Sequence, residues 1–144
     1  MSHTNPSDEK IREVLRNART IAVVGASEKP FRPSHGVMSY LKAEGYRILP
    51  VNPNLAGETL LGERVAADLA ELDRPVDIVD VFRNSEAAAG VVRAAIREKE
   101  RLAISTVWLQ IGVVNEQAAR EAADAGLDVV MDRCLKIEVA RLLA

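Results

Sequence analysis

The stretch Ile21-Ala-Val-Val-Gly-Ala-Ser27 decides the fold of this chain of 144 residues. Four consecutive apolar residues end in Gly25, and such an uninterrupted run is typical of a β-strand that is buried on both faces of a sheet. The residues that follow predict a helix that Ser34 caps and that Gly45 ends in a left-handed conformation. A second apolar run, residues 47–51, predicts the next strand. The segment therefore predicts two parallel strands joined by a helix.

The same alternation of strands and helices continues along the chain. We predict further strands at 76–81, 106–109 and 128–131, and helices at 87–99, 115–125 and from about Lys136, with a first helix that Ser7 caps. Residues 57–62 are expected to form a turn or a short strand pair, and residues 66–72 a two-turn helix. Pro50 removes one backbone donor from the second strand, which places that strand at a sheet edge or beside an irregularity.

Together these elements predict an α/β fold. We expect a Rossmann-like, doubly wound parallel sheet of about five strands in three layers, forming a single domain over residues 1–144. A chain of this length can bury a sufficient core without disulfides or a structural metal. In such sheets, ligands bind outside the carboxyl ends of the strands, so we expect the functional residues in the loops that follow the strands.

Composition and charge exclude several classes of function. The net charge is −2, and the chain has one Trp, two Tyr and two Phe, so it lacks the basic groove and stacking platforms of a nucleic-acid-binding protein. No run approaches the ~18 consecutive apolar residues that a membrane span needs, and the N-terminus shows no apolar leader. Cys134 is the single cysteine, which fits a reducing compartment. We therefore expect a cytoplasmic protein with no nucleic-acid or membrane partner.

The loop after the first strand, residues 25–36, carries the strongest signal for a ligand. Gly25 lets the backbone approach a diphosphate closely, Ser27 offers a hydroxyl, and the next helix directs its unpaired N–H groups toward an anion. Lys29 and Arg32 can add positive charge. This combination favours a phosphate-binding loop over a simple tight turn.

Two features disfavour a standard NAD site, and other functions on this fold remain possible. The G-x-G-x-x-G fingerprint needs glycines where Ser27 and Pro30 stand. After the second strand an NAD enzyme places an acidic residue against the ribose, whereas this chain has Val51-Asn-Pro53. An NAD(P)-linked enzyme is still the alternative reading, and a flavodoxin-like or receiver-like interaction domain is a third. A receiver needs paired acids after the first strand, where this chain has Glu28 alone.

Five blocks of residues, most of them at predicted strand ends, resemble one known family. They are Gly25-Ala-Ser27, Val51-Asn-Pro53, Asp80-Val-Phe-Arg83, Trp108-Leu-Gln-x-Gly112, in which x stands for any residue, and Asp132-Arg-Cys134. In this order and spacing, and over nearly its whole length, the chain is similar to the small stand-alone CoA-binding proteins related to the N-terminal domain of the succinyl-CoA synthetase α subunit. The resemblance implies a Rossmann-like domain that binds coenzyme A or an acyl-CoA.

The resemblance also implies a role for each matching position. The diphosphate would be held by Gly25, Ala26 and Ser27, with Arg32, Pro33 and Ser34 near it. The adenosine would be bordered by Val51, Asn52 and Pro53. The pantetheine or a phosphate would be flanked by Phe82 and Arg83, and the far side would be lined by Gln110 and Gly112. Trp108 is expected in the core instead.

No catalytic constellation is recognisable in the sequence. Succinyl-CoA synthetase relies on a phosphorylated histidine and on further domains, whereas here His3 is expected in a disordered tail and His35 at the start of a helix, without a recognisable nucleophile and orienting acid. We therefore expect a binding module without catalysis and without a metal. Cys134 has two readings, a buried small side chain or a partner of the CoA thiol in a mixed disulfide. Alanine-rich helix faces permit a homodimer.

Overall fold

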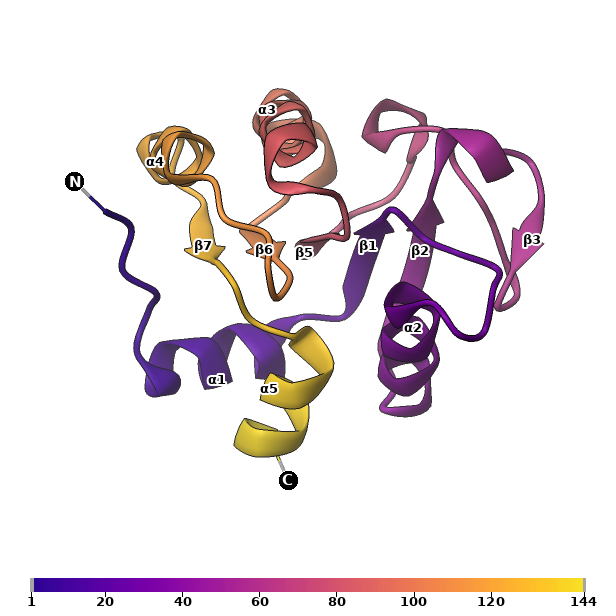
Figure 1. Ribbon diagram of the computed structural model, residues 1–144, viewed down its shortest axis with the longest axis horizontal. Helices are drawn as coiled ribbons and strands as arrows, with labels where there is room; N and C mark the ends of the chain where they lie inside the picture. The colour runs from indigo at the N-terminus through magenta and orange to yellow at the C-terminus, as the bar shows by residue number, and fades with distance from the viewer. Residues whose placement is uncertain (1, 144) are drawn as a thin grey trace.

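Five parallel strands form one sheet in the order β2-β1-β5-β6-β7 within residues 2–143, which the computed structural model describes (Figure 1). Their bounds are β1 Thr20–Val24, β2 Arg47–Val51, β5 Ile78–Val81, β6 Thr106–Leu109 and β7 Asp128–Val130. The register of β1 on β2 runs from Thr20 opposite Arg47 to Val24 opposite Val51. Pro50 therefore lies in an edge strand, as predicted.

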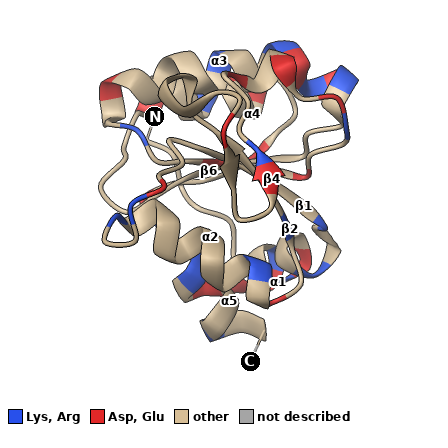
Figure 2. Ribbon diagram, turned by 90° about the vertical axis from the view of Figure 1, so that its right-hand side faces the viewer, with Lys and Arg blue, Asp and Glu red and all other residues tan. Residues whose placement is uncertain are grey.

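Helices cover both faces of this sheet, so the domain has three layers (Figure 1). One face carries α1 (Asp8–Asn17), α2 (Pro33–Ala43) and α5 (Leu135–Leu143), and the other carries α3 (Ser85–Leu102) and α4 (Glu116–Asp124). Charged residues lie mainly on the helices and loops, and the layer between them is largely uncharged (Figure 2). The predicted Rossmann-like α/β fold is confirmed. None of the helices within residues 2–143 is long and apolar enough to cross a membrane.

The two faces of the sheet carry separate apolar cores, and β1 contributes to both. Ile21 and Val23 pack on the side of α1, α2 and α5, whereas Ala22 and Val24 pack on the side of α3 and α4. Burial on both faces explains why this strand is apolar without alternation. Trp108 is also fully buried, and its Nε1 donates a hydrogen bond to the Arg133 carbonyl at 3.0 Å. Its predicted place in the core is confirmed.

The winding direction of the sheet reverses between β1 and β5. From β1 the chain crosses to β2 on one side, and from β5 it continues through β6 to β7 on the other. The loops that leave β1 and β5 therefore diverge and leave a crevice at the carboxyl edge, where doubly wound proteins bind ligands. The fold thus brings residues 25–32 and 82–84 to one place.

The start of α2 differs from the prediction. Arg32 occupies the cap position without a side-chain hydrogen bond, Pro33 is the first helical residue, and Ser34 lies buried in the first turn. The fixed φ of proline suits the first position of a helix, where no backbone donor is needed. The prediction that Ser34 caps this helix was wrong.

The prediction of a two-turn helix at residues 66–72 was also wrong. Ala66 pairs with the outer side of β2 instead: its N–H donates to the Pro50 carbonyl at 3.1 Å, and its carbonyl accepts from Asn52 at 2.9 Å. The helical part is the short 3-10 helix η2, Leu69–Glu71, which Asp68 caps. Backbone pairing with the edge strand outweighs the helix propensity of the alanines. A short strand pair is present, but it extends past the predicted segment 57–62: β3 is Thr59–Leu60, and β4, Glu63–Arg64, lies after it.

The N-terminal segment is held against the domain, contrary to the expectation of a disordered tail around His3. The Asn5 side chain donates to the Met131 carbonyl at 2.9 Å and accepts from the Met131 N–H at 2.8 Å. The His3 backbone N–H donates to the Glu116 carboxylate at 2.6 Å. In Figure 1 this segment accordingly descends beside β7 and α4 to α1. The Asn5 side chain bonds to Met131 as the backbone of a neighbouring strand would. Because this contact depends on one residue, no periodic pattern in the sequence predicts it.

Candidate functional site

A cleft of about 760 Å³ opens at the carboxyl edge of the sheet, at the crevice between β1 and β5. The segments that follow all five strands, together with the first turns of α2, line it. The lining residues are Gly25, Ser27, Glu28, Lys29, Arg32, Pro33, Ser34 and Val37 from the first loop and α2, Asn54 and Leu55 after β2, Phe82 and Arg83 after β5, Gln110, Ile111 and Val113 after β6, and Cys134 after β7. A cleft of this size is in the range that cofactors and small ligands occupy.

Gly25 forms the floor where β1 leaves the sheet. Its φ is +95°, and a Cβ placed there would lie 2.2 Å from the Phe82 carbonyl oxygen. Its N–H donates to the Val51 carbonyl at 2.9 Å, and the Phe82 N–H donates to the Val24 carbonyl at 2.8 Å. Because the backbones of β1, β2 and the β5 loop meet here without a side chain between them, a ligand can approach the backbone closely.

The first loop leads from Gly25 into the N-terminus of α2. Ser27 lines the cleft, and its hydroxyl accepts a hydrogen bond from the Lys29 N–H at 3.1 Å, which tightens the turn. The helix that follows has no acidic residue in its first turn and no side-chain cap. Pro33 has no N–H, and the His35 and Gly36 N–H groups donate to the Arg32 carbonyl at 3.1 and 3.4 Å, so the Ser34 N–H and the positive end of the helix dipole are what this terminus offers to an anion in the cleft.

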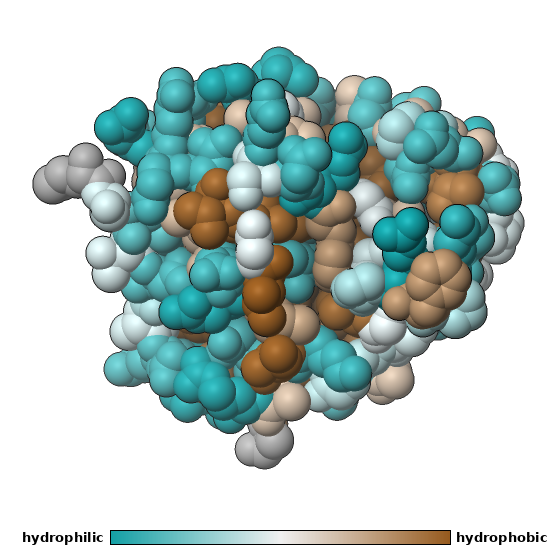
Figure 3. All heavy atoms as spheres, viewed as in Figure 1, coloured by the Kyte–Doolittle hydropathy of each residue, from teal (hydrophilic) through white to brown (hydrophobic). Residues whose placement is uncertain are grey.

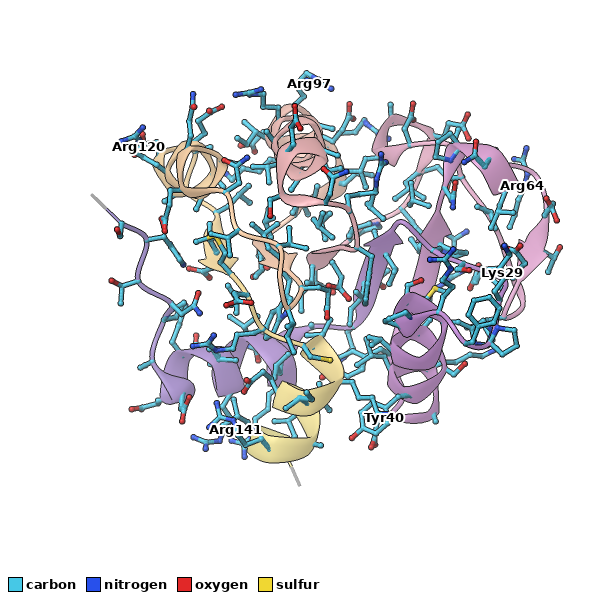
Figure 4. The ribbon with its side chains drawn as sticks, viewed as in Figure 1. Lys29, Tyr40, Arg64, Arg97, Arg120 and Arg141 are labelled. Atoms are coloured by element: carbon cyan, nitrogen blue, oxygen red, sulfur yellow. The ribbon has the colours of Figure 1, made fainter. Side chains whose placement is uncertain are left out.

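Three cations line the cleft. Lys29 and Arg32 come from the first loop, and Arg83 follows β5. Among residues 2–143, none of the three forms an ion pair with a carboxylate. Figure 4 shows Lys29 on the loop between β1 and α2. Unpaired cations next to a helix N-terminus suit a ligand that carries phosphate groups.

A buried carboxyl group supports the wall of the cleft. Asp80, in β5, has no exposed surface, and its Oδ1 accepts a hydrogen bond from Gln110 Nε2 at 2.7 Å. Its Oδ2 has no hydrogen-bond partner among residues 2–143. Burial raises the pKa of Asp80 to about 8, against which the hydrogen bond from Gln110 acts only weakly. Asp80 is therefore mainly protonated at pH 7, and its Oδ1 fixes the side-chain amide of Gln110.

A second, smaller cavity of about 400 Å³ lies on the α3 side of the same sheet edge. Its walls are mainly apolar or small, and its lining residues are Val24, Val51, Pro53, Ala67, Asp68, Leu69, Arg83, Ala87, Gly90, Val91 and Ala94. Arg83 lines both cavities. The two cavities therefore share one guanidinium group. An extended ligand with one half in each cavity would contact it from both.

Most residues that the sequence predicts for the site lie on these two cavities. The cleft is lined by Gly25, Ser27, Arg32, Pro33, Ser34, Phe82, Arg83 and Gln110, and the second cavity by Val51, Pro53 and again Arg83. Three predicted residues, Ala26, Asn52 and Gly112, line neither cavity among the residues described. Ala26 is fully buried, and Asn52 bridges two loops, donating to the Ala26 carbonyl at 2.8 Å and accepting from the Asn54 N–H at 2.9 Å.

The structure adds residues that the sequence pattern did not single out. Leu55, Asn54 and Ile111 line the cleft although no motif marks them. Gly90 lines the second cavity from the middle of α3, and a glycine there was a usable signal, because it weakens a helix without any turn that needs it. Cys134 lies half-buried on the cleft wall, so its thiol is neither fully buried nor freely exposed.

The described residues contain no cluster of three His, Cys, Asp or Glu side chains that could hold a metal ion. His35 lies in the first turn of α2, as expected. Cys134 is the one nucleophilic thiol of the chain. The walls of the large cleft are suited to a charged group at one end and to an apolar group at the other.

Comparisons with known proteins agree with this geometry. Residues 19–140 match the family model described as "CoA binding domain". The uncharacterised protein YneT of Bacillus subtilis is 40% identical over 133 residues, which is 92% of this chain and 94% of YneT. A solved protein of Thermus thermophilus, cell-free ID.343, is 43% identical, with a TM-score of 0.89 over 95% of this chain and 99% of that one. A hypothetical protein of Pyrococcus horikoshii is 36% identical, with a TM-score of 0.89 over the whole of both chains. The chain therefore belongs to the family of CoA-binding domains.

Proposed function

We propose that this protein is a stand-alone, cytoplasmic module that binds coenzyme A or an acyl-CoA across the carboxyl edge of its sheet, without catalysing a reaction. The observation that carries the proposal is the cleft itself: a bare glycine backbone, a helix N-terminus without a side-chain cap and three cations that form no ion pair within residues 2–143 converge on it. A ligand with a diphosphate group satisfies all three features.

The proposed orientation follows from the two cavities. The diphosphate lies against Gly25 and the start of α2, and Arg83 contacts a phosphate from between the cavities. The adenosine occupies the smaller cavity, bordered by Val51 and Pro53. The pantetheine arm then runs through the cleft toward Gln110. Asn52 supports the site indirectly in this arrangement, because it holds the β2 loop to Ala26.

The alternative is an NAD(P)-linked enzyme on the same fold. No carboxylate follows β2 directly to receive the ribose hydroxyls, since the chain continues Asn52-Pro53 there. Asp68 does line the smaller cavity, but its carboxylate already accepts the Glu71 N–H at 3.2 Å as the cap of η2. Coenzyme A is therefore the better-supported ligand.

Thermal unfolding of the purified protein tests this choice. CoA, dephospho-CoA, NAD, NADP and FMN are compared at one concentration. A ligand present at 100 times its Kd stabilises the native state by about 2.7 kcal/mol, and for a domain of this size that raises the Tm by about 5 to 10 °C. We expect a rise with CoA, a smaller rise with dephospho-CoA and none with the nicotinamides. A rise with NAD alone would favour an enzyme instead.

Alkylation of Cys134 locates the bound ligand. The chain has one cysteine, so the loss of reactivity toward a maleimide reports on a single position in the cleft. Acetyl-CoA is the suitable ligand because it has no free thiol to consume the reagent. We expect saturating acetyl-CoA to slow alkylation several-fold. An unchanged rate while the Tm rises would place the ligand outside this cleft. Incubation with oxidised CoA, followed by intact mass measurement, tests the mixed disulfide.

A further inference from the structure

The large cleft has two chemically different ends. Among residues 2–143, the charged residues that line it come from the first loop and the end of β5: Glu28, Lys29, Arg32 and Arg83. The lining residues contributed after β6 and β7 are uncharged: Gln110, Ile111, Val113 and Cys134. A ligand that fills the whole cleft therefore has an anionic part and an uncharged part.

The uncharged end continues onto an exposed apolar surface. Ile111 lines the cleft and is 62% exposed, Val114 in the same loop is 44% exposed, and Ile137 in the first turn of α5 is 53% exposed. Figure 3 shows apolar side chains in a column over the loop after β6 and over α5. We call Ile111, Val114 and Ile137 the apolar column.

The fold itself does not require isoleucine at position 111. The turn after β6 is fixed by two backbone N–H groups: that of Gly112 donates to the side-chain Oδ1 of Asp132 at 2.7 Å, and that of Val113 donates to the Gln110 carbonyl at 2.9 Å. A polar side chain in so exposed a position would fold equally well. The isoleucine gains favourable free energy only when something apolar covers it.

The cations nearest in sequence to Cys134 do not compensate for the missing charge at this end. The Arg133 guanidinium donates to the Asp132 carbonyl at 2.8 Å. The ammonium group of Lys136 lies 5.3 Å from the centre of the Tyr40 ring. Neither residue lines the cleft. A carboxylate placed against Ile111 and Val113 would therefore give up part of its hydration without gaining a cationic partner.

We infer that the apolar end of the cleft and the apolar column receive the acyl group of an acyl-CoA, and that the protein selects thioesters with a hydrocarbon acyl chain over free CoA and over dicarboxylic thioesters. The inference rests on the proposed function, which places the diphosphate at β1. The end of β6 is two strand spacings from β1, about 10 Å, and the extended pantetheine arm is longer than that. The thioester then reaches Ile111, and the acyl chain covers it.

The test is a series of dissociation constants, measured by calorimetry on the full chain with CoA, acetyl-CoA, butyryl-CoA, hexanoyl-CoA and succinyl-CoA. Each buried methylene strengthens binding by about two- to fourfold, the upper value corresponding to 0.8 kcal/mol. Butyryl-CoA and succinyl-CoA have the same number of acyl carbons and differ by a terminal methyl against a carboxylate. We expect butyryl-CoA to bind at least about tenfold more tightly than succinyl-CoA.

Two variants separate this inference from the proposed function. Ile111→Ser, at an exposed position, should flatten the increase along the series. Arg83→Ala should weaken the binding of every ligand by a similar factor and keep the increase in affinity with acyl-chain length.

A flat series in the wild-type protein, with CoA bound, would overturn the inference and leave the proposed function standing. No binding of any member would overturn both. A flat series together with a dimer that Ile111→Ser dissociates would assign the apolar column to a second copy of the chain.

Discussion

Gly25 tolerates a side chain less well than the other seven glycines of the chain. Its φ of +95° and the 2.2 Å distance from a hypothetical Cβ to the Phe82 carbonyl leave no room for a methyl group. We expect Gly25→Ala to lower the free energy of unfolding by about 2 kcal/mol or more, because strain and overlap add. Gly36→Ala is the control: a Cβ there meets nothing within 4 Å, so the helix should gain up to about 1 kcal/mol. Equal urea midpoints of the two variants would contradict this account.

Arg83 is the residue whose charge should matter most for binding, because it lines both cavities. We expect Arg83→Ala to weaken CoA binding about tenfold or more, the usual effect of removing one charge-assisted contact to a phosphate. Arg97→Ala removes the same charge from α3, where the side chain points away from the domain (Figure 4). Calorimetric titration of both variants should show a loss in the first alone. Equal losses would indicate that net charge, and not a local contact, governs affinity.

At the level of elements, α3 contains a glycine that packing does not explain. Gly90 lies in the middle of the helix and lines the smaller cavity, and a Cβ there would meet nothing within 4 Å. We expect Gly90→Ala to raise the free energy of unfolding by about 0.5–1 kcal/mol in the absence of ligand. The same methyl group should lower the affinity for CoA several-fold, since it fills space that the adenosine needs. Urea unfolding and calorimetry check the two effects separately. A variant that is more stable and binds equally well would place the adenosine elsewhere.

The elements that could be predicted from the sequence are those with a strong periodic or capping signal. The strand that begins near Ile21 is recognisable because it is buried on both faces and is therefore apolar throughout. The helix after Asn115 is recognisable because the Asn115 side chain caps it by accepting from the Ala118 N–H. The segment at residues 66–72 could not be predicted, because its conformation depends on pairing with β2, a contact with residues about fifteen positions earlier. Because the sequence of residues 66–72 does not reveal that they pair with a strand, the helix propensity of their alanines predicts a helix instead.

Across the whole molecule, the candidate site could be predicted where it adjoins strand ends. Gly25 directly follows β1 and Arg83 is the second residue after β5, and the reversal of winding between those strands brings them together. Leu55 and Ile111 could not be predicted, because they enter the cleft through loop geometry that leaves no pattern in the sequence. The role of Asn52 was visible only in part: its position beside the site follows from β2, whereas its hydrogen bond to Ala26 follows from the fold.

The free energy of unfolding of the whole molecule should depend on pH because of the buried Asp80. Its pKa is about 8 in the folded protein, compared with 3.8 as the ordinary value for an exposed aspartate. Between these values the unfolded chain has lost the proton and the folded protein has kept it, so unfolding releases a proton. The stability associated with neutral Asp80 is therefore fully present below about pH 4 and is lost as the pH rises to about 8, by up to about 1.4 kcal/mol per pH unit.

Asp80→Asn isolates this effect, because asparagine keeps an oxygen for Gln110 Nε2 and cannot ionise. We expect the free energy of unfolding of the wild-type protein to fall more steeply than that of the variant between pH 5 and pH 8. Other titrating groups are shared, so the difference between the two curves belongs to position 80. Asp8, whose pKa the hydrogen bond from Arg141 lowers, gives the opposite slope at acid pH in both proteins. Parallel curves would mean that Asp80 ionises in the folded protein near its ordinary pKa. The carboxylate would then need a partner, such as a water molecule, at Oδ2.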